Sequence, residues 1–174
     1  MDGGGIHYEN PFVDPPGARS AGRRLRGRLA SPVTLWTAGG PESPAGLTVS
    51  SLIVADGEPA SILGLISDTT ELYEALTSTG RFVVHVFEEG QRLLADRFAG
   101  LRPSPGGIFS DLEVIPGPYG PQVAGIATRA FCRLAEVTEQ GYQHLVRGDI
   151  DGVELGELER PLVHFRGRYR PLSG

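Results

Sequence analysis

The stretch Gly46-Leu47-Thr48-Val49-Ser50-Ser51 decides the fold of this chain. Its threonine and valine favour extended backbone, because β-branched side chains fit a pleated and half-buried surface. We therefore predict one β-strand over residues 47–55. Three hydroxyl side chains, Thr48, Ser50 and Ser51, fall in the first half of this strand. Hydroxyl groups both donate and accept hydrogen bonds, so this cluster is a candidate binding surface for a polar ligand.

The segments around this strand are mainly of β type and are separated by turns that contain glycine or proline. Further strands are predicted at 33–38, 60–66, 81–87, 112–115, 123–137, 142–153 and 162–169, and helices at 19–29, 70–79 and 91–99. Segment 60–66 is apolar on both faces, which predicts a central strand. The tight turns between successive strands predict a mainly β fold, an antiparallel barrel of about seven strands with two or three helices that fill its gaps.

Length and composition indicate one folded domain. The chain has 174 residues, of which 40% are hydrophobic and 21% are charged, values typical of globular proteins. Residues 1–18 are rich in glycine and proline and are predicted to form a flexible N-terminal arm, followed by a single domain over 19–174. The sequence has neither a long apolar run nor a secretory signal, so we expect no membrane span and a cytoplasmic location.

The reactive and charged residues exclude several kinds of chemistry. A net charge of -5 argues against a dedicated nucleic-acid-binding protein. All 16 basic residues are arginine, so a lysine Schiff base is excluded. A single cysteine, Cys132, and four widely separated histidines do not have the spacing of zinc ligands, and we expect no metal. The serine hydrolase elbow and the glycine-rich loops of common nucleotide-binding folds do not occur in the sequence.

Two charged or polar segments have more than one interpretation. The arginines at 19, 23, 24, 26 and 28 are typical of a solvated helix face or a subunit contact, and a phosphate-contacting arm is the less frequent alternative. The turn Ser67-Asp68-Thr69-Thr70 precedes a predicted helix, where hydroxyls and unpaired backbone N–H groups can bind a phosphate. The same turn can simply cap the helix, since Asp68 and Glu71 fit a capping arrangement.

A collinear series of segments resembles a known family. It comprises 46–51, a proline-led apolar strand at 59–66, the hydroxyl-rich turn into a helix, Gly80-Arg81-Phe82-Val83-Val84-His85-Val86, a helix that ends in Arg97-Phe98-Ala99-Gly100, and 161–169. Together these segments, from about Ser31 to Leu172, resemble the flavin reductase-like, FMN-binding split-barrel proteins. The resemblance implies a split β-barrel that forms a homodimer and binds flavin near the subunit interface. It implies oxidation of NADH or NADPH and transfer of reduced flavin, FMN or alternatively FAD, to a monooxygenase partner.

The resemblance also assigns roles to residues. Thr48, Ser50 and Ser51 would contact the ribityl chain and phosphate of the flavin, and Val49 and Leu65 would line its ring. The phosphate site would be completed by the turn residues Ser67, Asp68, Thr69 and Thr70, and further flavin contacts are expected from His85, His164 and Tyr169. His85 could equally be a strand histidine with one satisfied nitrogen, and Tyr169 a core aromatic. No catalytic side chain is implied, because hydride transfer between stacked rings depends on positioning and on the cofactor.

Two differences from the family pattern keep an alternative function open. Asp68 stands where many members carry a basic residue, and its negative charge opposes phosphate binding. Reductases often carry Gly-Asp-His on a late strand, whereas this chain has Gly141-Tyr142-Gln143-His144. A shift by one residue in a strand predicts that His144 lies on the opposite face. The alternatives are a flavin-binding protein that lacks the nicotinamide site and, as a third hypothesis, a dimeric barrel without a cofactor.

Overall fold

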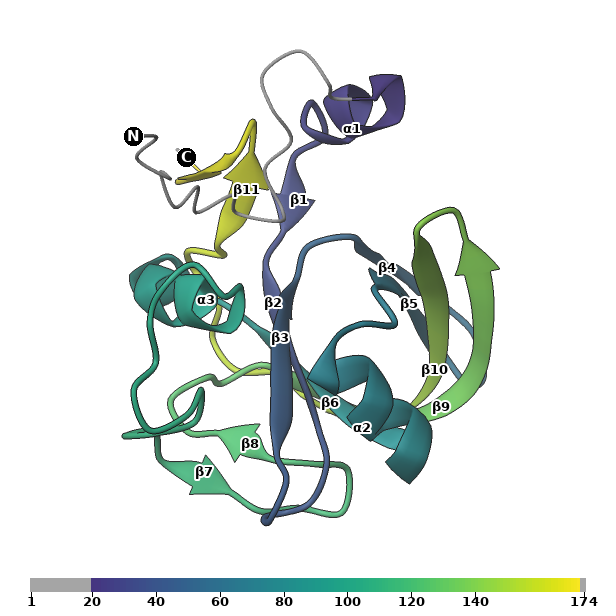
Figure 1. Ribbon diagram of the computed structural model, residues 1–174, viewed down its shortest axis with the longest axis vertical. Coiled ribbons are helices and arrows are strands. Elements are labelled where there is room, and N and C mark those ends of the chain that lie inside the picture. Colours follow the sequence, from purple (N-terminus) through teal and green to yellow (C-terminus); the bar gives the residue numbers. More distant parts are fainter. Residues whose placement is uncertain (1–19, 173–174) are drawn as a thin grey trace, which may run out of the picture.

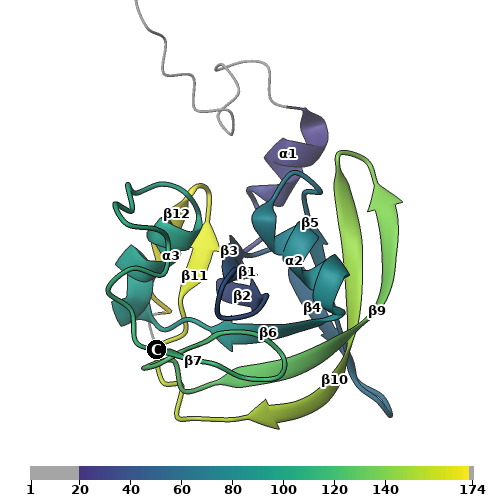
Figure 2. The ribbon, with the colours of Figure 1, turned by 60° about the horizontal axis from the view of Figure 1, so that its bottom comes forward.

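A curled antiparallel sheet is the main feature of the computed structural model, which describes residues 20–172 (Figures 1 and 2). The sheet has seven strands in the order β3-β2-β6-β9-β10-β5-β4 within these residues. Their bounds are β2 Thr34–Ala38, β3 Ala45–Val49, β4 Leu52–Ala55, β5 Ser61–Ile66, β6 Arg81–Val86, β9 Arg129–Gln140 and β10 Gln143–Glu154. The predicted mainly β split barrel is confirmed, and the predicted arm at 1–18 lies outside the described residues.

The predicted strand at 47–55 is interrupted, and this interruption splits the barrel. Strand β3 ends at Val49 and pairs with β2 at one edge of the sheet, whereas β4 begins at Leu52 and pairs with β5 at the other edge. Ser50 and Ser51 therefore connect the two edges of the curled sheet directly. A single continuous strand was the wrong prediction, because this short crossing changes the pairing partner without a turn motif that the sequence would reveal.

Two small sheets extend the barrel. One contains β1 Ser31–Pro32, β11 Val163–Phe165 and β12 Arg168–Arg170, and the other contains β7 Val114–Ile115 and β8 Gln122–Val123. The predicted last strand at 162–169 is thus a hairpin, and the predicted strand at 123–137 begins only at Arg129. Segment 60–66 was predicted to be central, and β5 is an interior strand, paired with β10 on one side and with the edge strand β4 on the other.

Three α-helices lie within the described residues, as the sequence predicts. They are α1 Ala21–Arg26, α2 Glu71–Thr79 and α3 Arg92–Phe98, and a short 3-10 helix, η1 Glu89–Gln91, precedes α3. Thr70 rather than Asp68 caps α2, because the Thr70 hydroxyl accepts a hydrogen bond from the backbone N–H of Tyr73 at 3.2 Å. Gly80 ends α2 in the left-handed conformation that favours glycine. No helix in residues 20–172 is long and apolar enough to cross a membrane.

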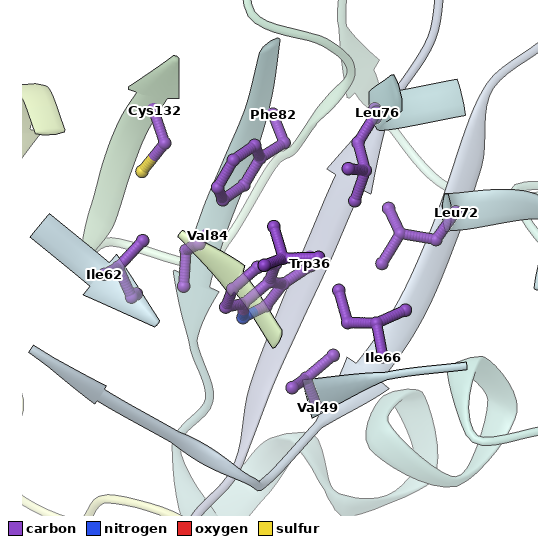
Figure 3. Close-up of a cluster of buried hydrophobic side chains, with 11 residues drawn as sticks. Trp36, Val49, Ile62, Ile66, Leu72, Leu76, Phe82, Val84 and Cys132 are labelled. Atoms are coloured by element: carbon purple, nitrogen blue, oxygen red, sulfur yellow. The ribbon is translucent and has the colours of Figure 1, made fainter. Parts of the chain in front are cut away.

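The main core fills the space between α2 and the curled sheet (Figure 3). The rings of Trp36 on β2 and Phe82 on β6 stack with centroids 4.9 Å apart and planes 11° apart. A Cβ atom on Gly64 would lie 2.6 Å from the Trp36 ring, and one on Gly148 would lie 2.4 Å from the Phe82 ring. Glycine at these two strand positions therefore makes room for the aromatic pair.

A second core cluster lies on the other side of the sheet, under α3. Its fully buried members include Val33, Leu35, Phe87, Phe98 and Leu162. The two clusters are separated by strands β2 and β6, in which all residues of β2 and residues 82–85 of β6 are buried, on both faces of the sheet. The middle of the sheet, at β2 and β6, is therefore covered on both sides by packed side chains.

Candidate functional site

A cleft of about 450 Å³ opens at the break between β3 and β4, and we call it the Ser50–Ser51 cleft. Its lining comes from α1, from the β3–β4 break, from the end of β5, from the cap of α2, and from the starts of β10 and the β11–β12 hairpin. The lining residues are Arg23, Arg26, Gly27, Ser31, Leu47, Thr48, Val49, Ser50, Ser51, Leu65, Ile66, Ser67, Thr70, Ala99, Gln143, His164 and Gly167. The topology therefore brings most of the predicted site residues into one place.

The β3–β4 break supplies the hydroxyl wall of the cleft. Thr48 is held toward α3, because its hydroxyl donates a hydrogen bond of 2.7 Å to the carbonyl oxygen of Ala95. The oxygen of Thr48 can still accept a hydrogen bond. Ser50 and Ser51 are partly exposed at the cleft surface. The backbone carbonyl of Ser51 is bonded to the N–H of Leu65, so the groups that these residues offer to a ligand are above all their two side-chain hydroxyls.

The turn before α2 contributes only part of its predicted set. Ser67 and Thr70 line the cleft, while Asp68 and Thr69 are exposed and do not. The Thr70 hydroxyl donates to the carbonyl oxygen of Ser67 at 2.8 Å, so its proton is already used. The hydroxyl oxygens of Ser67 and Thr69 lie 2.9 Å apart and share one hydrogen bond. Local hydrogen bonds thus satisfy much of this turn, which matches its interpretation as a helix cap.

Apolar side chains form the floor of the cleft. Leu47 and Leu65 are partly exposed to it, and Val49 and Ile66 reach it from the barrel core. The predicted contribution of Val49 and Leu65 to a ring-binding surface remains a prediction, and both residues lie where it requires them. An apolar floor beside a hydroxyl wall is the usual composition of a small-molecule site.

The cleft is cationic where α1 lines it, and we call this part its cationic end. Arg23 and Arg26 line it there, and His164 of β11 is close enough to Arg26 to be affected by its charge. The pKa of His164 lies below its ordinary value, first because burial disfavours its charged form and second because of the positive charge of Arg26. His164 is therefore a neutral imidazole at pH 7, able to donate one hydrogen bond and accept another.

Two predicted flavin contacts lie outside the cleft. His85 is fully buried on β6, where its Nδ1 lies 3.1 Å from the carbonyl oxygen of Leu35 and its Nε2 accepts from the backbone N–H of Val123 at 3.1 Å. Burial lowers the pKa of His85 to about 4, so the ring is neutral. His85 connects β2, β6 and β8, and both of its nitrogens have partners, where the interpretation as a strand histidine expected one. Its predicted flavin contact stays a prediction.

Tyr169 also has a structural environment. It packs against the second core cluster, and its ring makes an edge contact with His164 at a centroid distance of 6.0 Å. Burial raises the pKa of Tyr169, and a hydrogen bond with Asp96 raises it further. Tyr169 thus supports the cleft through His164 and does not line it.

Gln143 and His144 occupy opposite faces at the start of β10, as the sequence predicts. Gln143 lines the cleft. His144 packs against Tyr73 of α2, with ring centroids 5.0 Å apart. The position facing the cleft is therefore a neutral amide, which can donate and accept hydrogen bonds but cannot take up a proton near pH 7.

The sequence did not reveal the contributions of Arg23, Arg26, Gly27 and Ser31. The arginine run was visible, but a run of charge in a short helix does not show which surface it faces. The position of the arginines could have been inferred from the pairing of the strand that follows α1. Ser31 pairs with His164 in a β-bridge, which brings the end of α1 to the β11–β12 hairpin and hence to the cleft.

The residues present fit a flavin nucleotide. Such a ligand has an apolar ring system, a chain of hydroxyl groups and a phosphate. The cleft offers an apolar floor, hydroxyls at Ser50, Ser51 and Ser67, and guanidinium groups at Arg23 and Arg26. Its volume is in the range typical of small-molecule sites. Within residues 20–172 no group of three or more histidine, cysteine or acidic side chains could hold a metal ion.

Comparisons with known proteins agree with this composition. Residues 26–173 match the family described as flavin reductase like domain. The chain is 30% identical over 154 residues to the reductase component of 4-hydroxyphenylacetate 3-monooxygenase from Thermus thermophilus, covering 88% of this chain and 97% of that protein. It is 32% identical over 158 residues to the NADH-dependent FMN reductase AsuE2 of Streptomyces nodosus subsp. asukaensis, covering 89% and 85% of the two chains.

The fold is also shared with solved structures. It resembles BorF, the flavin reductase component of a bacterial two-component tryptophan halogenase, with a TM-score of 0.76 and 26% identity. That match covers 88% of this chain and 99% of BorF. The family match spans most of the chain and includes every strand of the curled sheet. This chain therefore belongs to the flavin reductase-like domain family.

Proposed function

We propose that this chain is an NADH- or NADPH-dependent flavin reductase that supplies reduced flavin to a monooxygenase component. FMN is the expected flavin and FAD the alternative. The observation that carries the proposal is the Ser50–Ser51 cleft, in which the hydroxyl wall, the apolar floor and the cationic end lie together. Relatives whose names describe reductase components of monooxygenases and NADH-dependent FMN reductases support the same activity.

The side chains of the cleft would act by binding and positioning. Bound flavin supplies the redox chemistry, since it accepts a hydride from reduced nicotinamide. Leu47, Leu65 and Ile66 would exclude water from one face of the ring, and Ser50 and Ser51 would orient its polar chain. Gln143 and His164 would contribute hydrogen bonds to the ligand, and hydride transfer to flavin needs no proton donor from either side chain. Orientation of two reactants accounts for the catalysis in such a site.

Gln143 is the observation that favours a second function. At the cleft position where reductases of this family often present histidine, this chain presents an amide, and His144 faces α2 instead. A flavin-binding protein without hydride transfer would show this replacement. The sequence identity to named reductases favours the first proposal, and one experiment separates the two.

That experiment is anaerobic reduction of bound flavin. Purified protein with FMN is mixed with NADH and, separately, with NADPH while the absorbance of oxidised flavin is followed. Rapid bleaching with either donor, faster than for free FMN, would support the reductase. Flavin that binds but keeps its absorbance would instead assign the non-reductase function. The Gln143→His variant is informative in both cases, since it restores the family residue at the cleft.

We also propose that the protein is a homodimer. Edge strand β4, which begins directly after Ser51, exposes two large apolar side chains, Ile53 at 67% and Val54 at 63%. Exposed apolar groups on an open sheet edge are unfavourable in a monomer and suit a partner. Sedimentation should show a dimer that Ile53→Arg with Val54→Arg converts to a monomer. Leu93→Arg, a control on α3 with 64% exposure, should leave the dimer intact. A monomeric wild-type protein would contradict the proposal.

A cytoplasmic location stays a prediction from the sequence.

A further inference from the structure

The cleft has an uneven distribution of charge. Among the described residues that line it, the charged side chains are Arg23 and Arg26, and none is aspartate or glutamate. Both arginines belong to α1, and the residues that follow α1 contact the β11–β12 hairpin, since Arg166 donates to Gly27 and Ser31 pairs with His164. This part of the cleft therefore attracts anions, and guanidinium groups bind phosphate oxygens with two parallel hydrogen bonds.

The turn at the start of α2 is much less suited to a phosphate. The turn carries Asp68, and Glu71 is the first residue of the helix. The two carboxylates add negative charge where a phosphate would have to bind. The hydroxyl proton of Thr70 is already donated to Ser67, and Ser67 and Thr69 bond to each other. This turn offers mainly oxygen atoms that accept hydrogen bonds. Such acceptors suit the hydroxyl groups of a sugar better than a phosphate dianion.

The arginine segment is fixed to the rest of the site by backbone contacts. The carbonyl oxygen of Gly27, directly after α1, accepts a hydrogen bond of 3.0 Å from the backbone N–H of Arg166 in the β11–β12 turn. Ser31, four residues after Gly27, pairs with His164 of β11. Ser20 caps the first turn of α1. The ribbon views show α1 at the same end of the molecule as the turn between β9 and β10 (Figures 1 and 2).

We propose that Arg23 and Arg26 form the phosphate subsite of the Ser50–Ser51 cleft. The inference rests on the proposed function for the presence of a nucleotide and goes beyond it in naming which residues hold the phosphate group. The ligand chemistry is a phosphate ester of a nucleotide. It can belong to the flavin, as the 5′-phosphate of FMN, or to the reduced nicotinamide dinucleotide, and the experiment below separates these sources. The α2 turn then contacts hydroxyl groups of the ligand.

The experiment compares two double variants that carry the same change of charge. Arg23→Gln with Arg26→Gln removes the cleft arginines, and Arg24→Gln with Arg28→Gln removes two arginines of the same segment that do not line the cleft. Circular dichroism and thermal unfolding confirm that both variants fold. Affinities for FMN and for riboflavin, which lacks the phosphate, are measured by fluorescence quenching. KM is then measured for NADH, NADPH and reduced nicotinamide riboside, which lacks phosphate.

The two sources of phosphate give different results. If the flavin phosphate occupies the subsite, the Arg23–Arg26 variant binds FMN about tenfold to a hundredfold more weakly, as expected for lost charge-assisted hydrogen bonds, and binds riboflavin unchanged. If the nicotinamide dinucleotide occupies it, FMN affinity stays and KM rises for NADH and NADPH but not for reduced nicotinamide riboside. The Arg24–Arg28 control should match the wild type in every measurement.

A different pattern would overturn the inference. If the Arg23–Arg26 variant matches the control in FMN affinity and in KM for both dinucleotides, the subsite is elsewhere. Failure of the proposed function is recognisable separately. In that case NADH and NADPH do not reduce the flavin bound to the wild-type protein. A loss of affinity for FMN but not for riboflavin in the Arg23–Arg26 variant would still show that the two arginines hold the phosphate.

Discussion

The backbone N–H of Leu65 donates a hydrogen bond of 2.9 Å to the carbonyl oxygen of Ser51. This contact ties the break between β3 and β4 to β5, and β5 pairs through Leu65 with Leu145 of β10. Because the bond uses only backbone atoms, it fixes the position of Ser51 while its hydroxyl stays available to the cleft. The hydroxyl wall and the apolar floor are thus parts of one rigid frame, and side-chain substitutions can test them without disturbing it.

Replacing the two serines at the break should weaken flavin binding and leave folding intact. Each hydroxyl that bonds to the ligand contributes a hydrogen bond, so Ser50→Ala with Ser51→Ala should reduce FMN affinity roughly tenfold or more. Fluorescence quenching of FMN measures this change. Ser78→Ala, on the exposed side of α2, is the control and should bind like the wild type. Unaltered affinity in the double variant would remove both serines from the site.

Gly64→Ala should destabilise the barrel. The added Cβ would lie 2.6 Å from the Trp36 ring, so the stacked Trp36–Phe82 pair or strand β5 must shift. Overpacking of this kind costs about 1–3 kcal/mol. Urea unfolding of the variant measures the loss. Gly40→Ala is the control, because nothing lies within 4 Å of its added Cβ. Equal stability of the two variants would show that the core accommodates the methyl group.

His85 should make stability fall at acidic pH. Its pKa is lowered to about 4 in the folded protein, from 6.5 for an ordinary histidine. Between these values the unfolded chain binds a proton that the native protein does not, so the free energy of unfolding decreases as pH falls from 6.5 toward 4. The full loss is about 3 kcal/mol, from 1.36 kcal/mol for each unit of pKa.

The measurement compares wild type with His85→Gln in urea at several pH values. The variant has no imidazole to titrate, so the difference in unfolding free energy between the two proteins should narrow as pH falls below 6.5. Above pH 7 the difference should be constant, because His85 is neutral in both states there. A difference that does not depend on pH would show that His85 keeps an ordinary pKa.

Cys132 should be unreactive in the native protein. It is fully buried in the main core, and burial raises the pKa of its thiol to about 12. The reactive thiolate is therefore almost absent at pH 8. A thiol reagent such as DTNB should modify the native protein only as fast as it unfolds, and should modify it at once in denaturant. Rapid labelling of the folded protein at pH 8 would contradict this burial.

The strands and helices could be predicted from the sequence because their patterns are local. Thr48-Val49 on β3, the apolar run of β5 and Gly80 at the end of α2 are each recognisable from neighbouring residues. The break at Ser50–Ser51 could not be predicted in this way. It arises because β3 and β4 pair with strands at opposite edges of the sheet, and such pairing depends on residues distant in the sequence.

The part of the cleft that could be predicted from the sequence lies next to the break between β3 and β4. Thr48, Ser50 and Ser51 line one cleft, and their contacts with flavin stay a prediction. The surroundings of His85 could not be predicted, because a strand histidine faces either the core or a ligand, and only the structure shows that Leu35 and Val123 bond to its two nitrogens. The place of Arg23 and Arg26 at the cleft could not be predicted either. It depends on a contact between distant residues, in which the N–H of Arg166 donates to the carbonyl oxygen of Gly27 directly after α1.

A crystal structure of the protein grown with FMN is the most direct test of the central claim, which is that the Ser50–Ser51 cleft binds the flavin. We predict density for FMN in this cleft, with the hydroxyl of Ser50 or Ser51 within hydrogen-bond distance of the ligand and the ring against Leu65. Density in another cavity would contradict the account. The apolar pocket between the β2–β3 turn and the loop at 109–121, which includes Phe109 and Leu112, is the alternative location to inspect.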